Sequence, residues 1–158
     1  ILSALTGRQP GEILEKGPDL ADEVFRRRIQ VLTQALMDRA PQATNAFDVL
    51  AKLGSLEIAA MVGFYSGAAV YGIPLILDDG VTLAAALLTV RLLPESRHYF
   101  FASQAGDDPA SELALRELGL TPFLDRAVSY GGGAAALFLL PNLDLSASLL
   151  GDQGGIKP

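Results

Sequence analysis

The side chains best suited to chemistry in this sequence lie where short apolar segments end. Asp78 and Asp79 follow the apolar run 74–77, and Ser103 ends a second run at 99–103. The carboxyl ends of parallel strands meet at one edge of a sheet, where such sheets bind ligands. Asp78 and Ser103 are therefore candidate substrate-binding residues, and Asp79 is a further possibility. The alternative for each is an ordinary helix cap or strand end.

Three consecutive glycines, Gly131, Gly132 and Gly133, precede an apolar segment that predicts a helix over 134–150. Backbone N–H groups at the start of a helix can hold a phosphate, so the three glycines are candidate substrate-binding residues. A flexible loop or tight turn would explain them equally well, because a glycine run is a weak motif on its own.

Other ionisable residues give weaker signals. Arg28 could bind a carboxylate or phosphate through its guanidinium, although Arg26 and Arg27 beside it favour a solvated helix face. Glu57 precedes an apolar run, so we expect either a buried structural carboxylate or a functional group. We expect His98 to be an ordinary surface histidine.

The composition excludes several classes of protein. The chain has 158 residues, half of them hydrophobic, and a net charge of −6, which fits one domain with a real core. A broad nucleic-acid-binding face would need many more clustered cations. The absence of cysteine and the presence of one histidine exclude disulfides, thiolate metal sites and histidine-rich metal sites.

The uncharged stretch 58–77 needs a membrane check, since about 20 apolar residues can span a bilayer. Glycines at 63, 67 and 72 interrupt the stretch and Pro74 breaks it, so a small-residue helix leading into a buried strand explains it better. The chain starts at Ile1 without an initiator methionine or a basic leader. We therefore expect a fragment or processed chain. From the interruptions in the stretch 58–77, we expect no membrane association.

These groups need helices and strands to position them. Asp19 is expected to cap a helix over 20–39, and Asn45 to cap a second helix that ends at Gly54. The pattern then predicts, in order, a helix over 56–71, a strand over 74–78, a helix over 82–93, a strand over 99–103, a helix from 107 to 119, a helix over 134–150 interrupted by Pro141, and a tail over 151–158. This alternation predicts an α/β fold with a parallel sheet that is only partial in this chain.

Several stretches resemble one family in order and spacing. The longest reads NAFDVLAKLGSLEIAAMVG over 45–63, and a second reads GAAVYGIPLILD over 67–78. Shorter similarities lie at 4–7 and 84–94, so the resemblance covers about residues 2–150. The family it resembles is nicotinate-nucleotide–dimethylbenzimidazole phosphoribosyltransferase, and the chain looks like its C-terminal portion.

The resemblance implies a Rossmann-like α/β fold, with helices on both faces of the sheet and a small helical part. Residues 1–130 would form the α/β part, 131–150 the glycine loop and last helix, and 151–158 the tail. It implies a cytoplasmic enzyme that transfers phosphoribose from nicotinate mononucleotide to 5,6-dimethylbenzimidazole in cobalamin lower-ligand synthesis, without metal or organic cofactor. The expected partners are a second copy, as a homodimer, or the missing N-terminal half.

The chain departs from this family at residues that matter for catalysis. Gly132 stands where the family has a glutamate that takes the benzimidazole proton, Gln104 replaces a histidine, and Asp79 replaces a glycine. Glu57, Asp78 and Asp79 are the candidate replacements for the base. A catalytically degenerate homologue that binds nucleotide or benzimidazole, or a non-catalytic structural subunit, is therefore the alternative.

The alignment of Gly132 with the family's glutamate gives a direct prediction. The variant Gly132→Glu should raise phosphoribosyl transfer, because it restores a carboxylate that can accept the azole proton. The measurement is turnover with dimethylbenzimidazole and nicotinate mononucleotide. An unchanged rate in a variant that still binds both substrates would contradict the alignment.

Overall fold

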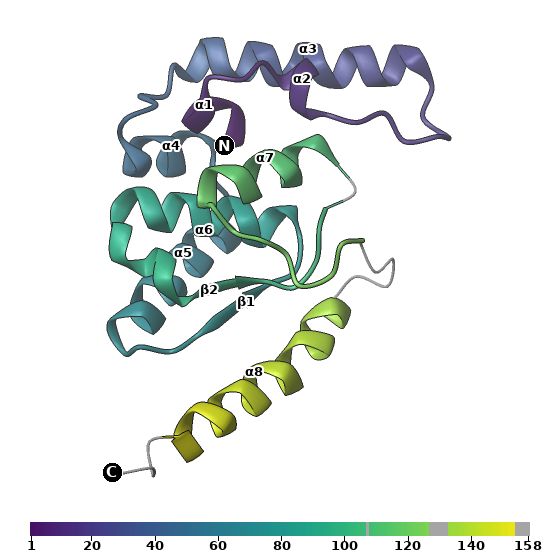
Figure 1. Cartoon of the computed structure of the whole chain (residues 1–158). Coiled ribbons are helices and arrows are strands. Elements are labelled where there is room, and N and C mark those ends of the chain that lie inside the picture. Colours follow the sequence, from purple (N-terminus) through teal and green to yellow (C-terminus); the bar gives the residue numbers. More distant parts are fainter. Residues whose placement is uncertain (107, 127–132, 154–158) are drawn as a thin grey trace.

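The structure is a computed structural model, and it describes residues 1–106, 108–126 and 133–153. Figure 1 shows the arrangement of its elements. Its helices are α1 (Leu2–Thr6), α2 (Pro10–Ile13), α3 (Asp22–Arg39), α4 (Ala46–Leu53), α5 (Leu56–Val70), α6 (Gly80–Leu92), α7 (Pro109–Leu118) and α8 (Ala134–Gln153), with a 3-10 helix η1 (Pro94–Tyr99). Its strands are β1 (Leu75–Leu77) and β2 (Phe100–Ala102).

The two strands form a parallel pair in which Leu75 lies opposite Phe100 and Leu77 opposite Ala102. Helix α6 and η1 connect them, as a parallel crossover requires. Helices α5, α6 and α7 lie on one side of the pair and α8 on the other (Figure 1). The predicted α/β fold is confirmed, and the described part of the sheet is limited to these two strands and a bridge between Gln104 and Leu124.

Side-chain caps explain where several helices begin. Asn45 accepts a hydrogen bond from the backbone N–H of Asp48 at the start of α4, and Asp108 does the same for α7 from Ser111. Both caps agree with the sequence, because Asn and Asp bond the free N–H groups of a first turn. The predicted cap at Asp19 is wrong: α3 begins at Asp22, and its N-cap residue has no side-chain hydrogen bond.

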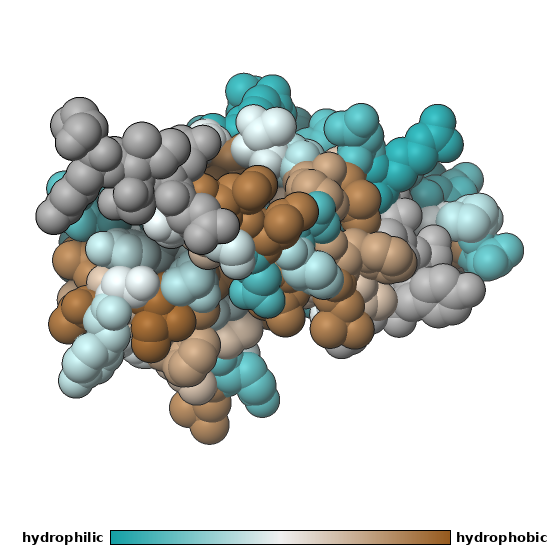
Figure 2. Space-filling view, turned by 60° about the horizontal axis from the view of Figure 1, so that its bottom comes forward, coloured by the Kyte–Doolittle hydropathy of each residue, from teal (hydrophilic) through white to brown (hydrophobic). Residues whose placement is uncertain are grey.

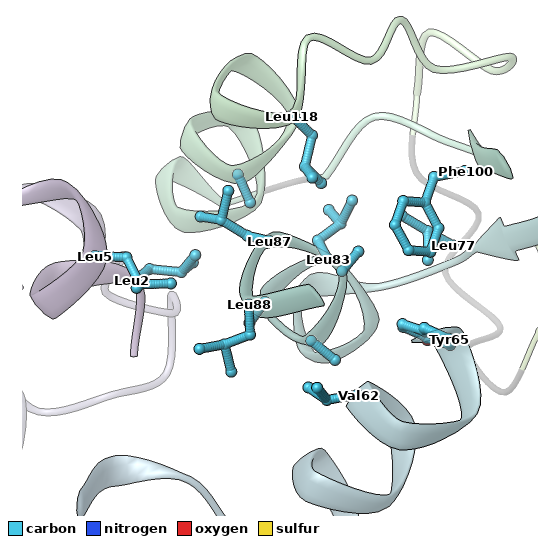
Figure 3. Close-up of a cluster of buried hydrophobic side chains, with 14 of the residues drawn as sticks. Leu2, Leu5, Val62, Tyr65, Leu77, Leu83, Leu87, Leu88, Phe100 and Leu118 are labelled. Atoms are coloured by element: carbon cyan, nitrogen blue, oxygen red, sulfur yellow. The ribbon is translucent and has the colours of Figure 1, made fainter. Parts of the chain in front are cut away.

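Helix α6 is the centre of the core, and Figure 3 shows its leucines surrounded by side chains from the other elements. Every residue from Leu83 to Thr89 is buried, as expected of a helix that is apolar on all sides. Tyr65 from α5 meets Phe100 edge to face, with ring centroids 5.5 Å apart. The core therefore joins α5 and α6 to β2.

The helical spacing of Phe64 predicts a core residue, but its side chain is 66% exposed. Helix α3 has no buried residue, so the apolar side chains along it are largely uncovered. The expected end of the last helix is also wrong. Helix α8 continues through Pro141 to Gln153, instead of being interrupted at Pro141 and followed by a tail from residue 151. A single missing N–H costs one intrahelical hydrogen bond, which a long helix can tolerate.

Helix α8 contacts the rest of the described chain mainly along one side. Ala135 and Leu139 are buried, whereas large apolar side chains face outward along the helix: Leu137, Phe138, Leu140, Leu145, Leu149 and Leu150. Figure 2 shows hydrophobic residues gathered on the face that carries α8. By length and composition alone, the window 134–151 could also cross a membrane. The stretch 58–77, in contrast, is divided between α5 and β1, as predicted.

The burial of Tyr65 predicts a loss of stability at alkaline pH. Desolvation, and then the charge of Asp79, raise the pKa of the Tyr65 hydroxyl from 10.0 to about 12. Between these values the unfolded chain has lost a proton that the folded chain still holds, so stability falls as pH rises from about 10 to about 12. We expect urea unfolding of Tyr65→Phe to show a smaller decline over this range.

The matched control is Tyr71→Phe, because Tyr71 is 82% exposed. It should retain the decline of the wild-type protein. An identical alkaline decline in the Tyr65→Phe variant would show that ionisation of Tyr65 does not limit stability.

Candidate functional site

The carboxylate of Asp78 lies at the carboxyl end of β1 and joins three parts of the chain. Its Oδ1 accepts hydrogen bonds from Ser103 Oγ at 2.8 Å and from the backbone N–H of Ala136 at 3.1 Å. Its Oδ2 accepts one from the backbone N–H of Gly133 at 2.8 Å. The end of β1, the residue after β2 and the start of α8 therefore meet at one side chain.

The proton of the Ser103 hydroxyl has two acceptors within reach, the Leu77 carbonyl oxygen at 2.9 Å and the Asp78 carboxylate. The Leu77 oxygen already accepts the backbone N–H of Ser103. We assign the hydroxyl proton to Asp78, because a hydrogen bond to a charged acceptor is the stronger one. The Gln104 side-chain amide adds a bond to the Asp78 backbone oxygen at 2.8 Å.

The start of α8 depends on Gly133. Its φ of +87° is a left-handed conformation that favours glycine. Asp78 accepts the N–H groups of this residue and of Ala136, which is where a helix N-terminus favours negative charge. The Gly133 N–H, predicted to be available to a phosphate, is thus bonded to a carboxylate of the chain itself. Gly131 and Gly132 lie outside the described residues.

The two neighbouring aspartates have different roles. The helix-cap alternative for Asp78 is realised at α8, not at the helix that follows it in sequence. Asp79 caps that helix, α6: its side chain accepts the backbone N–H of Thr82 at 2.8 Å, and the Thr82 hydroxyl accepts the backbone N–H groups of both aspartates. Asp79 and Thr82 thus form a capping box at the start of α6, with Thr82 where the usual sequence signature has Glu or Gln.

The other candidate residues lie apart from this cluster. Glu57 is exposed in the first turn of α5, which corrects the expectation that it is buried. The Ser55 hydroxyl, and then its own backbone N–H, lower the pKa of the Glu57 carboxyl below 4.5, so it is poorly matched to take a proton near neutral pH. Arg28 is exposed on α3, which Figure 1 places far from α8.

His98 is exposed and lies 3.7 Å from Glu95, as expected of a surface histidine. Among the described residues, no group of three or more His, Asp and Glu side chains is placed to hold a metal ion. No pattern in the sequence indicates the role of the Ala136 N–H, because any residue other than proline can donate a backbone hydrogen bond.

The geometry of the cluster allows one further hydrogen bond. A carboxylate has about four lone-pair positions, and bonds from the described residues take three of them at Asp78: two on Oδ1 and one on Oδ2. The described part of the chain thus leaves one position on Oδ2 for a further donor at the strand ends. Asp78 is therefore the one candidate carboxylate that lies directly beside the described end of the glycine run.

The comparisons with known proteins agree with one another. A phosphoribosyltransferase family matches residues 1–154 of the chain. The chain is 35% identical over 153 residues to the nicotinate-nucleotide–dimethylbenzimidazole phosphoribosyltransferase of Desulforamulus reducens. This alignment covers 97% of the chain and 44% of the relative. It is 32% identical to the protein of the same name from Clostridium acetobutylicum, over 92% of the chain and 42% of the relative.

A solved structure resembles this chain over the same extent. The crystal structure of CobT from Thermus thermophilus superposes with a TM-score of 0.83 and 32% sequence identity, covering 94% of this chain and 44% of that one. The chain thus spans less than half the length of the relatives it matches. On the extent of the family match, the chain belongs to the nicotinate-nucleotide–dimethylbenzimidazole phosphoribosyltransferase family.

Proposed function

We propose that this chain contributes the strand-end part of a site that transfers phosphoribose from nicotinate mononucleotide to 5,6-dimethylbenzimidazole in the cytoplasm. The observation that carries the proposal is the convergence of Asp78, Ser103 and Gly133 at the carboxyl ends of β1 and β2. Open parallel sheets bind ligands at this edge. Relatives that bear the name of this activity support the choice of substrates.

The reaction would exchange one bond at the ribose anomeric carbon for another. The bond to the nicotinate nitrogen breaks, and a nitrogen of dimethylbenzimidazole forms the new bond. The second benzimidazole nitrogen then loses its proton to a base. In this chain we assign that role to the Asp78 lone pair that the described residues leave open, since Asp79 caps α6 and Glu57 lies exposed on α5.

The same proposal assigns Ser103, Gly131, Gly132 and Gly133 to substrate binding beside Asp78. In the structure, Ser103 and Gly133 both bond Asp78 directly. Arg28 belongs to the substrate site only if the rest of the protein, or a partner, brings substrate to α3.

Binding without turnover is the second candidate function. Gly132 cannot accept a proton through a side chain, and donors from the described residues already use three of the four lone-pair positions of Asp78. Both observations favour a chain that holds nucleotide or benzimidazole but transfers phosphoribose slowly or not at all.

Pairing with further polypeptide is part of the proposal. The outer edge of β1 has no strand beside it among the described residues, and the outward face of α8 is apolar. Buried parallel strands need neighbours and cover on both faces. We propose that a second copy, or a polypeptide equivalent to the unmatched part of the relatives, covers the outward face of α8 and the open edge of β1.

Calorimetric titration with nicotinate mononucleotide, followed by a turnover assay with dimethylbenzimidazole, separates the two candidate functions. Heat of binding followed by formation of nicotinate supports the transferase. Heat without nicotinate supports the non-catalytic binder. Absence of heat with either ligand, in a folded protein, would contradict both candidate functions.

The hydrogen bonds of Asp78 predict the effect of Asp78→Asn. The variant places an amide donor or a neutral oxygen against the Gly133 and Ala136 N–H groups, so one of them loses its acceptor. A buried donor without a partner costs about 1–3 kcal/mol. We expect the amides in the first turn of α8 to exchange with deuterium roughly tenfold faster or more, and nucleotide binding to weaken.

Asp144→Asn is the matched control, because Asp144 is exposed on the same helix. It should leave exchange in the first turn of α8 unchanged. Equal exchange in the wild-type protein and the Asp78→Asn variant would mean that Asp78 does not hold this turn.

The pairing proposal predicts the mass of the protein in solution. A single chain has a mass of 16.6 kDa, and sedimentation at increasing concentration should show association. Phe138→Glu on the outward face of α8 should weaken that association without unfolding the chain. A monomer that also fails to bind the unmatched portion of the Desulforamulus relative would contradict the proposal.

A further inference from the structure

A cavity of about 580 Å³ lies on the far side of α6 from the strand pair, between the N-terminal helices and the core. Helices α1, α2 and α3 line one wall, and α4 and the first turns of α5 and α6 line the other. Most of the lining is apolar, including Ile13, Leu36, Ile58 and Val81. The volume is within the range of small-molecule sites, about 300–1,000 Å³.

Arg39 and Lys52 carry the charged side chains in the described lining, and no carboxylate side chain lines it. The Lys52 ammonium bonds Asp48 at 2.9 Å and the Ala40 carbonyl oxygen at 3.1 Å. Because Ala40 follows Arg39, both cations lie at the end of the cavity where α3 and α4 finish. Lys52 is already paired, whereas in the described part of the chain no ion pair or hydrogen bond engages the Arg39 guanidinium.

The wall formed by α3 is incompletely packed. This helix has 18 residues and none of them is buried. Leu32 and Leu36 line the cavity from this helix, and Leu32 is still 41% exposed. An apolar ligand between α3 and α6 would remove these side chains from water, which is favourable in proportion to the area covered.

We propose that this cavity binds a small apolar monocarboxylate, with its hydrocarbon between α3 and α6 and its carboxylate at Arg39. The planar guanidinium of arginine matches a carboxylate with two parallel hydrogen bonds. Arg39 is exposed, so beside a neutral ligand of the same shape its guanidinium would bond water and would add no charge-assisted bond to the ligand. Aromatic and aliphatic acids share this chemistry, and the test below distinguishes them.

This site is separate from the cluster at the strand ends. None of Asp78, Ser103 and Gly133 lines the cavity, and binding here requires no phosphoribosyl transfer. Binding of an acid in this cavity would therefore neither support nor contradict the proposed function.

The test is calorimetric titration of the full chain with three probes: 2-naphthoate, octanoate and the neutral 2-naphthamide. We expect at least one acid to bind about tenfold or more tightly than the amide, since charge-assisted hydrogen bonds are the stronger kind. Binding of naphthoate alone identifies an aromatic acid site, and binding of octanoate alone an aliphatic one. Equal affinity for acid and amide, or no binding of either acid, would overturn the proposal.

Variants locate the site. Arg39→Gln should remove the preference for acid over amide, whereas Arg27→Gln, the same change at another exposed position of α3, should keep it. Ala35→Phe adds a ring to the α3 wall and should block both acids. Because that variant could disturb packing, chemical-shift changes of the Ile13 and Ile58 methyl groups on adding the acid provide a second measurement. Shifts confined to other methyl groups would contradict the placement.

Discussion

The hydrogen bonds of one carboxylate fix where α8 begins relative to the ends of the two strands. Asp78 stands at the end of β1 and accepts hydrogen bonds from Ser103 and from the first turn of α8. Without an acceptor there, two backbone N–H groups at the start of α8 would lose their partner, and half-buried donors without partners are costly. The position of Gly133 and of the start of α8 relative to the strand ends therefore depends on Asp78.

The sequence predicted the elements better than it predicted their contacts. Caps at Asn45 and Asp108 and both strands are local signals, carried by residue type and spacing, and they agree with the structure. The bond between Asp78 and Gly133 joins residues 55 positions apart, so no local pattern could show that Asp78 caps α8. The exposure of Phe64 depends on which neighbours cover α5, and periodicity alone does not give that information.

The exposed apolar surface and the short sheet both belong to a chain that matches less than half the length of its relatives. Two strands and one central helix give a real core around α6, but α3 and α8 retain exposed apolar side chains, and the outer edge of β1 has no strand beside it among the described residues. The relatives that share this fold are more than twice as long as the matched portion. On the proposed function, contacts to the substrate's phosphate and base would be shared between this chain and the polypeptide that covers its open face.

The central claim is that substrate binds where Asp78, Ser103 and Gly133 meet. Backbone NMR spectra recorded during titration with nicotinate mononucleotide test it most directly. The account predicts that the largest shift changes fall on the amides of Asp78, Ser103, Gln104, Gly133 and Ala136. Changes confined to α3 and α4, with these five amides unmoved at saturation, would show that the strand-end cluster is not the substrate site.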